Sequence, residues 1–125
     1  MAAARTLYRW LTLLLILDVL AQFFLAGAGI FRAGPSVKAA RHSSAFDSHR
    51  LNGYVVLLLA LLTLLTAAAG RDARWRFALP LFVLALIQPM LAIKGWAGGL
   101  HALDGSLIVL LAAFLAHDAW AARAA

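Results

Sequence analysis

Two short motifs occur twice along the chain, and they hold the residue types best suited to chemistry. The segments beginning at Gln22 and Gln88 read Q-F-F-L-A-G-A-G and Q-P-M-L-A-I-K-G, so both fit Q-x-x-L-A-x-x-G. The segments beginning at His49 and His101 read H-R-L-N-G and H-A-L-D-G, so both fit H-x-L-[ND]-G. The glutamine motif precedes the histidine motif each time, which indicates a duplicated helical hairpin.

The two repeated histidines are candidate metal ligands. A two-helix repeat preserves topology, so the halves are expected to be related by a pseudo-twofold axis. His49 and His101 then begin parallel helices at the same end of the molecule and face each other. Two facing neutral imidazoles in a four-helix bundle are a ligand set for six-coordinate haem iron. The predicted cofactor is therefore haem b, with these two histidines as its metal ligands.

The residues around each histidine suit the same chemistry. Gly53 and Gly105 follow the histidines by four residues and lie on the same helix face, where a flat porphyrin can approach the backbone. Asn52 and Asp104 flank that face and are expected to bond the groups around the ligands. Three cations on the same side are predicted to pair with haem propionates: Arg41, Arg50 and Lys94.

The overall composition points to a membrane protein. Of 125 residues, 65% are hydrophobic and 13% are charged, with a mean hydropathy of +0.91. A soluble domain has about a quarter charged residues. The composition excludes a disordered chain and a nucleic-acid-binding domain. The absence of cysteine excludes disulfides, thiolate metal sites and cysteine nucleophiles.

Four apolar stretches must position the motifs, over residues 7–31, 51–69, 77–93 and 103–121. Each fits the roughly 17–25 residues of one membrane crossing. Backbone groups in lipid must pair internally, so the stretches are expected to be helices. The prediction is one all-α domain over residues 1–125, a bundle of four transmembrane helices. Its two tandem hairpins occupy about 7–70 and 77–122.

The basic residues indicate topology rather than nucleic-acid binding. The net charge is +6, and the basic residues sit at the ends of the apolar stretches. The compact turn at 70–76 holds three arginines and favours cytoplasmic termini. The Ala- and Arg-rich, Lys-poor composition is typical of a GC-rich bacterium. The expected location is the bacterial cytoplasmic (inner) membrane.

Several residues inside the apolar stretches have individual predicted roles. Asp18 is the only carboxylate deep in a stretch, so it is expected to be protonated, paired or turned inward. It serves either as a polar clamp between helices or as a proton or quinone site. Pro89 is expected to kink the third stretch and Met90 to fill the core. Gly27 and Gly29 are expected to allow close helix packing.

The order of the motifs resembles one four-helix half of the haem A synthase family. That family's fold is two such bundles, each with a histidine pair on its second and fourth helices. The resemblance implies haem ligation by His49 and His101. Phe46 stands where that family commonly has a catalytic carboxylate, so haem A synthesis is not implied. The chain is also similar to small uncharacterised bacterial four-helix membrane proteins, which implies the fold but no activity.

Three functions fit these observations. The first is a b-type haem-binding membrane protein for electron transfer or haem handling. The second is a cofactor-free structural or accessory subunit of a larger membrane complex. The third is an enzyme on a lipophilic substrate, with Asp18 or Asp47 in proton transfer. Besides the lipid bilayer, a redox partner, a larger complex and a second copy of the chain remain open as partners. A zinc or copper site is the alternative metal centre, formed by His42, Asp47, His49 and His101.

Overall fold

The chain folds into a bundle of four α-helices. The structure is a computed structural model, and it describes residues 2–33, 43–70, 73–92 and 97–121. Its α-helices are α1 (Ala2–Ala33), α3 (Asp47–Ala69), α4 (Trp75–Ile87) and α5 (Ala97–Ala121). Two 3₁₀ helices accompany them, η1 (Ser44–Phe46) before α3 and η2 (Gln88–Leu91) after α4. The described residues contain no β-strand, so the predicted all-α class is confirmed.

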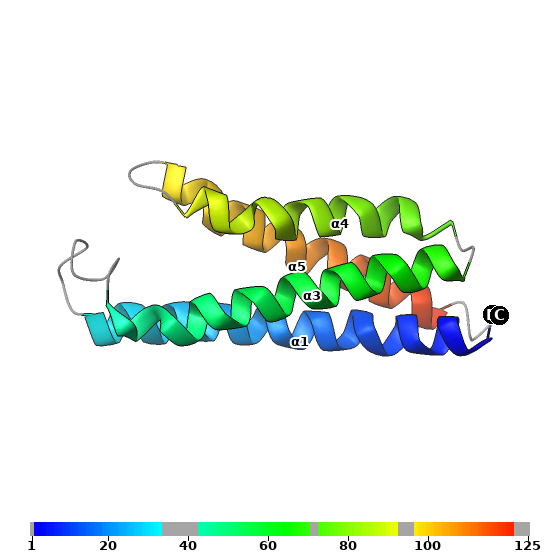
Figure 1. Cartoon of the computed structure of the whole chain (residues 1–125), viewed down its shortest axis with the longest axis horizontal. Helices are drawn as coiled ribbons and strands as arrows, with labels where there is room; N and C mark the ends of the chain where they lie inside the picture. Colours follow the sequence, from blue (N-terminus) through cyan, green and yellow to red (C-terminus); the bar gives the residue numbers. More distant parts are fainter. Residues whose placement is uncertain (1, 34–42, 71–72, 93–96, 122–125) are drawn as a thin grey trace.

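The helices form a ring in which each one packs against two neighbours. α1 packs along α3, α3 along α4, α4 along α5, and α5 along α1. Figure 1 shows the start of α1 and the end of α5 at one end of the bundle, beside the end of α3 and the start of α4. The opposite end holds the starts of α3 and α5. α3 and α5 are therefore diagonal in the ring, and each carries one histidine motif.

Three of the helices are long and apolar enough to cross a membrane. By length and composition these are Ala2–Ala33, Ser44–Ala69 and Gly98–Ala121, whereas Trp75–Leu91 is a shorter apolar helix. The 13 residues of α4 extend about 20 Å at about 1.5 Å per residue, which is less than a hydrocarbon core of about 30 Å. The chain is thus a helical membrane protein, and α4 is shorter than its other three α-helices.

A narrow core runs along the inside of the ring. Every helix contributes a fully buried side chain, namely Leu15, Thr63, Leu81 and Leu115. The Thr63 hydroxyl donates to the Leu59 carbonyl oxygen at 2.7 Å, so this buried polar group is satisfied. Many large apolar side chains face outward instead, including Phe24, Phe31, Leu58, Leu65 and Leu110. An apolar exterior around a narrow core is what lipid contact requires.

The helix α4 ends where the second glutamine motif begins. Pro89 has no backbone N–H to donate within a helix, and residues Gln88–Leu91 form the 3₁₀ helix η2 instead of a further α-helical turn. Pro80, by contrast, lies inside α4. The kink expected at Pro89 stays a prediction. The prediction that Met90 fills the core is wrong, because its side chain is 72% exposed.

Candidate functional site

The two repeated histidines lie side by side at the end of the bundle away from the termini. His49 is in the first turn of α3 and His101 is near the start of α5. Their ring centroids are 6.0 Å apart, with an angle of 71° between the ring planes. Both side chains are half-buried. Because α3 and α5 are diagonal in the ring of helices, the pair spans the inside of the bundle.

Each histidine ring is tied to the backbone of the glutamine from its own half. The Nδ1 atom of His49 lies 3.2 Å from the Gln22 carbonyl oxygen, and Nδ1 of His101 lies 2.9 Å from the Gln88 carbonyl oxygen. A carbonyl oxygen only accepts hydrogen bonds, so Nδ1 must carry the proton in both rings. In a neutral imidazole this leaves the lone pair on Nε2. Both rings therefore have the tautomer that a metal-binding histidine needs, fixed by an outer hydrogen bond.

The two bonds are possible for different local reasons. Gln22 lies inside α1, and its carbonyl oxygen has a second lone pair beside the one used along the helix. Gln88 opens η2, where the backbone changes from α to 3₁₀ geometry at Pro89. The Gln88 side chain adds a return bond, because its Nε2 donates to the His101 carbonyl oxygen at 3.0 Å. The glutamine motif thus holds the start of the next helix in place.

The repeated glycines allow the glutamine side chains to lie against the helices. A Cβ atom added at Gly53 would stand 3.3 Å from Nε2 of Gln22. At Gly105 it would stand 3.2 Å from Nε2 of Gln88 and 3.5 Å from the Phe23 ring. Both distances to glutamine are closer than ordinary side-chain packing. The structure therefore explains the glycines by this contact, and a porphyrin against the same faces remains a prediction.

Further polar side chains gather beside the histidines. We call Asp18, Gln22, Asn52, Gln88 and Asp104 the polar layer. Nδ2 of Asn52 donates to the Asp18 carbonyl oxygen at 3.3 Å and so links α3 to α1. The other four members each have a buried side-chain oxygen with no hydrogen-bond partner among the described residues.

The unsatisfied oxygens of the polar layer have a chemical consequence. Water cannot reach the hydrocarbon core freely, so a polar atom without a partner there costs several kcal/mol, on the order of 2–7. Ordered water or protonated carboxyl groups would supply the missing donors. The polar layer is therefore a place for polar groups or water next to the histidine pair. Asp18 belongs to it, as the sequence predicts for an inward-facing carboxyl group.

An aromatic residue that the sequence did not single out for packing completes the site. The Phe46 ring, in η1, lies edge-on to the His49 ring with centroids 6.3 Å apart. A Cβ atom at Gly29 would stand only 2.8 Å from two carbons of the same ring. Gly29 therefore provides the close packing expected of it. Gly27 does not, since a Cβ atom there meets nothing within 4 Å.

The predicted cationic partners of haem are only partly described. Arg50 is exposed and pairs with Asp47, with 2.6 Å between Nη1 and Oδ1. The same nitrogen donates to the Ser43 carbonyl oxygen at 3.3 Å. Arg41, Lys94 and His42 lie outside the described residues. Within the part of the chain that is described, no three His, Cys, Asp or Glu side chains gather as a metal-ion site. The zinc or copper alternative gains no support from these residues.

The fold and this site define a helical membrane protein with a histidine pair inside one end of its bundle. The chain belongs to a family of unknown function, DUF6220, whose family model matches residues 22–97. The matched segment includes Gln22, His49 and Gln88 and ends before His101. No curated protein and no solved structure matches the chain.

Proposed function

We propose that this protein binds one haem b, which His49 and His101 would hold as its two iron ligands, and serves in electron transfer or haem handling. The main support is the arrangement of the two imidazole rings. Two imidazole rings from diagonal helices stand 6.0 Å apart, and both Nδ1 atoms are held by backbone carbonyl oxygens. The resemblance of the motif order to one half of the haem A synthase family supports the same function.

The separation of the rings suits two ligands of one metal ion. An imidazole nitrogen binds a metal at about 2.0 Å, and the ring centre lies about 1 Å further out. Two rings on opposite sides of one metal are then separated by about 6 Å between centres. The observed 6.0 Å agrees with this value. The ring planes can rotate about the metal–nitrogen axis, so the angle of 71° between them is compatible with it.

The protein's own groups would control the properties of the bound group. A haem in this position supplies reversible one-electron chemistry at its iron. Held by both His49 and His101, the group would be suited to electron transfer rather than to activation of a substrate. The carbonyl oxygens of Gln22 and Gln88 orient the rings and make them more basic ligands.

We also propose that the chain crosses the membrane four times, as two tandem hairpins related by a pseudo-twofold axis. The matched contacts support this arrangement, since Gln22, His49 and Gly53 repeat the relations of Gln88, His101 and Gly105. The shorter α4 is extended by η2 to Leu91. The arginine-rich end, which holds the start of α1 and the end of α5, favours a cytoplasmic position in the bacterial inner membrane.

The two proposed ligands can be tested by mutation, with His117 as a control because it lies in α5 together with His101. The variants are His49→Ala and His101→Ala, and His117→Ala is the matched control near the other end of α5. The protein is expressed in a haem-replete host, and absorption spectra are recorded in detergent. We expect the low-spin spectrum in wild type and His117→Ala, and its loss in the other two variants. A wild-type spectrum in both site variants would contradict the proposal.

A second candidate function is a cofactor-free accessory subunit of a membrane complex. Its support is that polar side chains already join helices without any cofactor, through Asn52 to the Asp18 carbonyl oxygen and Gln88 to the His101 carbonyl oxygen. This function predicts colourless protein and co-purification with a partner. It also predicts that His49→Ala leaves the assembled complex intact.

A further inference from the structure

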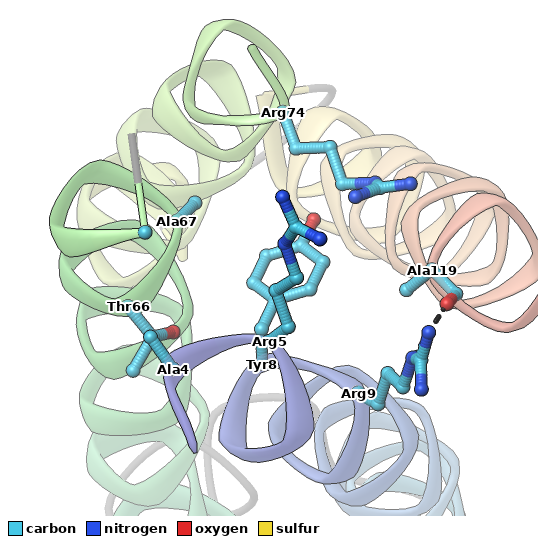
Figure 2. Close-up of a pocket in the computed structure, with 9 residues that line it drawn as sticks. Ala4, Arg5, Tyr8, Arg9, Thr66, Ala67, Arg74 and Ala119 are labelled. Carbon is cyan, nitrogen blue, oxygen red and sulfur yellow. Dashed lines mark hydrogen bonds between the residues drawn. The ribbon is translucent and has the colours of Figure 1, made fainter. Parts of the chain in front are cut away.

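A cavity opens at the opposite end of the bundle from the histidines. Its volume is about 260 Å³, and parts of all four helices surround it. Figure 2 shows the Arg5 side chain reaching the centre of the opening, while Arg74 extends across it from the start of α4. Buried Tyr8 and Ala67 form part of its wall. The volume is several times the roughly 30 Å³ that one water occupies, so a phosphate group fits.

The cavity carries excess positive charge. Three arginines line it, namely Arg5, Arg9 and Arg74. Arg74 forms an ion pair with Asp118, whereas Nε of Arg9 donates to the Ala119 carbonyl oxygen at 2.8 Å. Arg5 has no hydrogen-bond or ion-pair partner among the described residues. Among the residues that the structure describes, three guanidinium groups face one carboxylate, so arginine predominates around the cavity.

The donors that remain suit a tetrahedral oxyanion. A guanidinium group has five N–H donors, and Arg9 uses only its Nε–H among the described residues. The planar fork of arginine matches phosphate oxygens with two parallel bonds. The Thr66 hydroxyl already donates to the Leu62 carbonyl oxygen at 2.8 Å, so the arginines are the principal donors. A ligand with several acceptor oxygens and a negative charge would satisfy them.

The depth of the cavity indicates where such a ligand comes from. Trp10 and Trp120 follow directly after Arg9 and Ala119, and their rings pack edge to face with centroids 5.6 Å apart. Tryptophan is enriched at the level of lipid headgroups. The cavity therefore lies near the depth at which lipid phosphates are found.

We propose that this cavity binds a phosphate group held by Arg5, Arg9 and Arg74, as the headgroup of an anionic phospholipid or as a free phosphate. The proposal is independent of haem binding.

The test compares Arg5→Gln with Arg76→Gln in detergent. Arg76 lies at the same end and carries the same charge, but it does not line the cavity and stands 6.0 Å from the Trp75 ring. Thermal unfolding is followed by circular dichroism during titration with three probes. These are dioleoylphosphatidylglycerol, dioleoylglycerol (which lacks phosphate), and sodium phosphate at constant ionic strength. Helical content without probe verifies folding, and Arg5→Lys keeps the charge while removing the fork.

We expect phosphatidylglycerol to raise the unfolding temperature of wild type and Arg76→Gln, with dioleoylglycerol inactive. Arg5→Gln should need about fivefold more phosphatidylglycerol for half the effect, with Arg5→Lys in between. A lipid source is indicated if sodium phosphate acts only at much higher concentration, and a free phosphate if both act at similar concentrations. The proposal is overturned if neither phosphate-bearing probe acts, or if Arg5→Gln and Arg76→Gln respond alike.

Discussion

Gly29 and Gly27 stand two residues apart on α1 but have different surroundings, and this contrast yields a sharp prediction. At Gly29 an added Cβ atom would lie 2.8 Å from the Phe46 ring. Ordinary van der Waals contact begins at 3.4 Å, so this atom would be about 0.6 Å too close. Overpacking of this kind costs about 1–3 kcal/mol. Replacing a glycine inside a helix with alanine returns about 0.5–1 kcal/mol. Gly29→Ala should therefore lower the free energy of unfolding by up to about 2.5 kcal/mol, with a central value of about 1 kcal/mol.

The assay is reversible unfolding in detergent, followed by circular dichroism, with Gly27→Ala as the control. A Cβ atom at Gly27 meets nothing within 4 Å, so this variant should match wild type or exceed it by up to about 1 kcal/mol. With haem bound as proposed, Gly29→Ala should also shift its absorption band, because the Phe46 ring is edge-on to the His49 ring. Equal stabilities for the two alanine variants would refute the packing argument.

Two smaller predictions concern contacts between helices. Asn52→Leu removes the bond to the Asp18 carbonyl oxygen and should cost about 0.5–1.5 kcal/mol, as interhelical bonds in membranes do. Retention of full stability in the same unfolding assay would show that this bond contributes nothing. Asp118→Asn breaks the ion pair with Arg74. The side chain of Asp118 is 47% exposed and that of Arg74 is 20% exposed, so the loss should cost no more than about 1 kcal/mol of stability. Unfolding at low and high salt measures that cost, and a loss above about 3 kcal/mol would contradict a partly solvated pair.

Much of the fold follows from the sequence because membrane helices are encoded by composition and length. The apolar stretches predict the helices, and three of them have the length and hydropathy of membrane spans. The repeat predicts that His49 and His101 lie close together at one end, and their rings are 6.0 Å apart. This inference needs only the same order of the two motifs in each half and the rule that a hairpin repeat preserves direction.

The partners of those histidines could not be predicted in the same way. Metal-binding histidines commonly have a carbonyl or carboxylate oxygen beside the second ring nitrogen, but the sequence does not indicate that Gln22 and Gln88 use their backbone oxygens for this. That choice depends on how α1 and η2 are rotated toward the next helix. The packing of Phe46 on Gly29 depends likewise on the path of η1 into α3. Such contacts arise from tertiary geometry, which periodicity and motif spacing do not determine.

The exposure of Met90 shows the same limit. An apolar side chain in a membrane helix gains little from facing the core, because lipid is as apolar as the protein interior. Hydrophobicity therefore does not determine which face turns inward, and small residues and polar contacts do. Met90 lies in the 3₁₀ helix η2, and its side chain is 72% exposed.

Haem ligation by His49 and His101 can be tested with the absorption spectrum of the wild-type protein. Purified protein is reconstituted with haem b, and its reduced-minus-oxidised absorption spectrum is recorded together with a pyridine haemochrome assay. We expect a sharp low-spin α-band in the reduced state and about one haem per chain. A protein that remains colourless after reconstitution would contradict it.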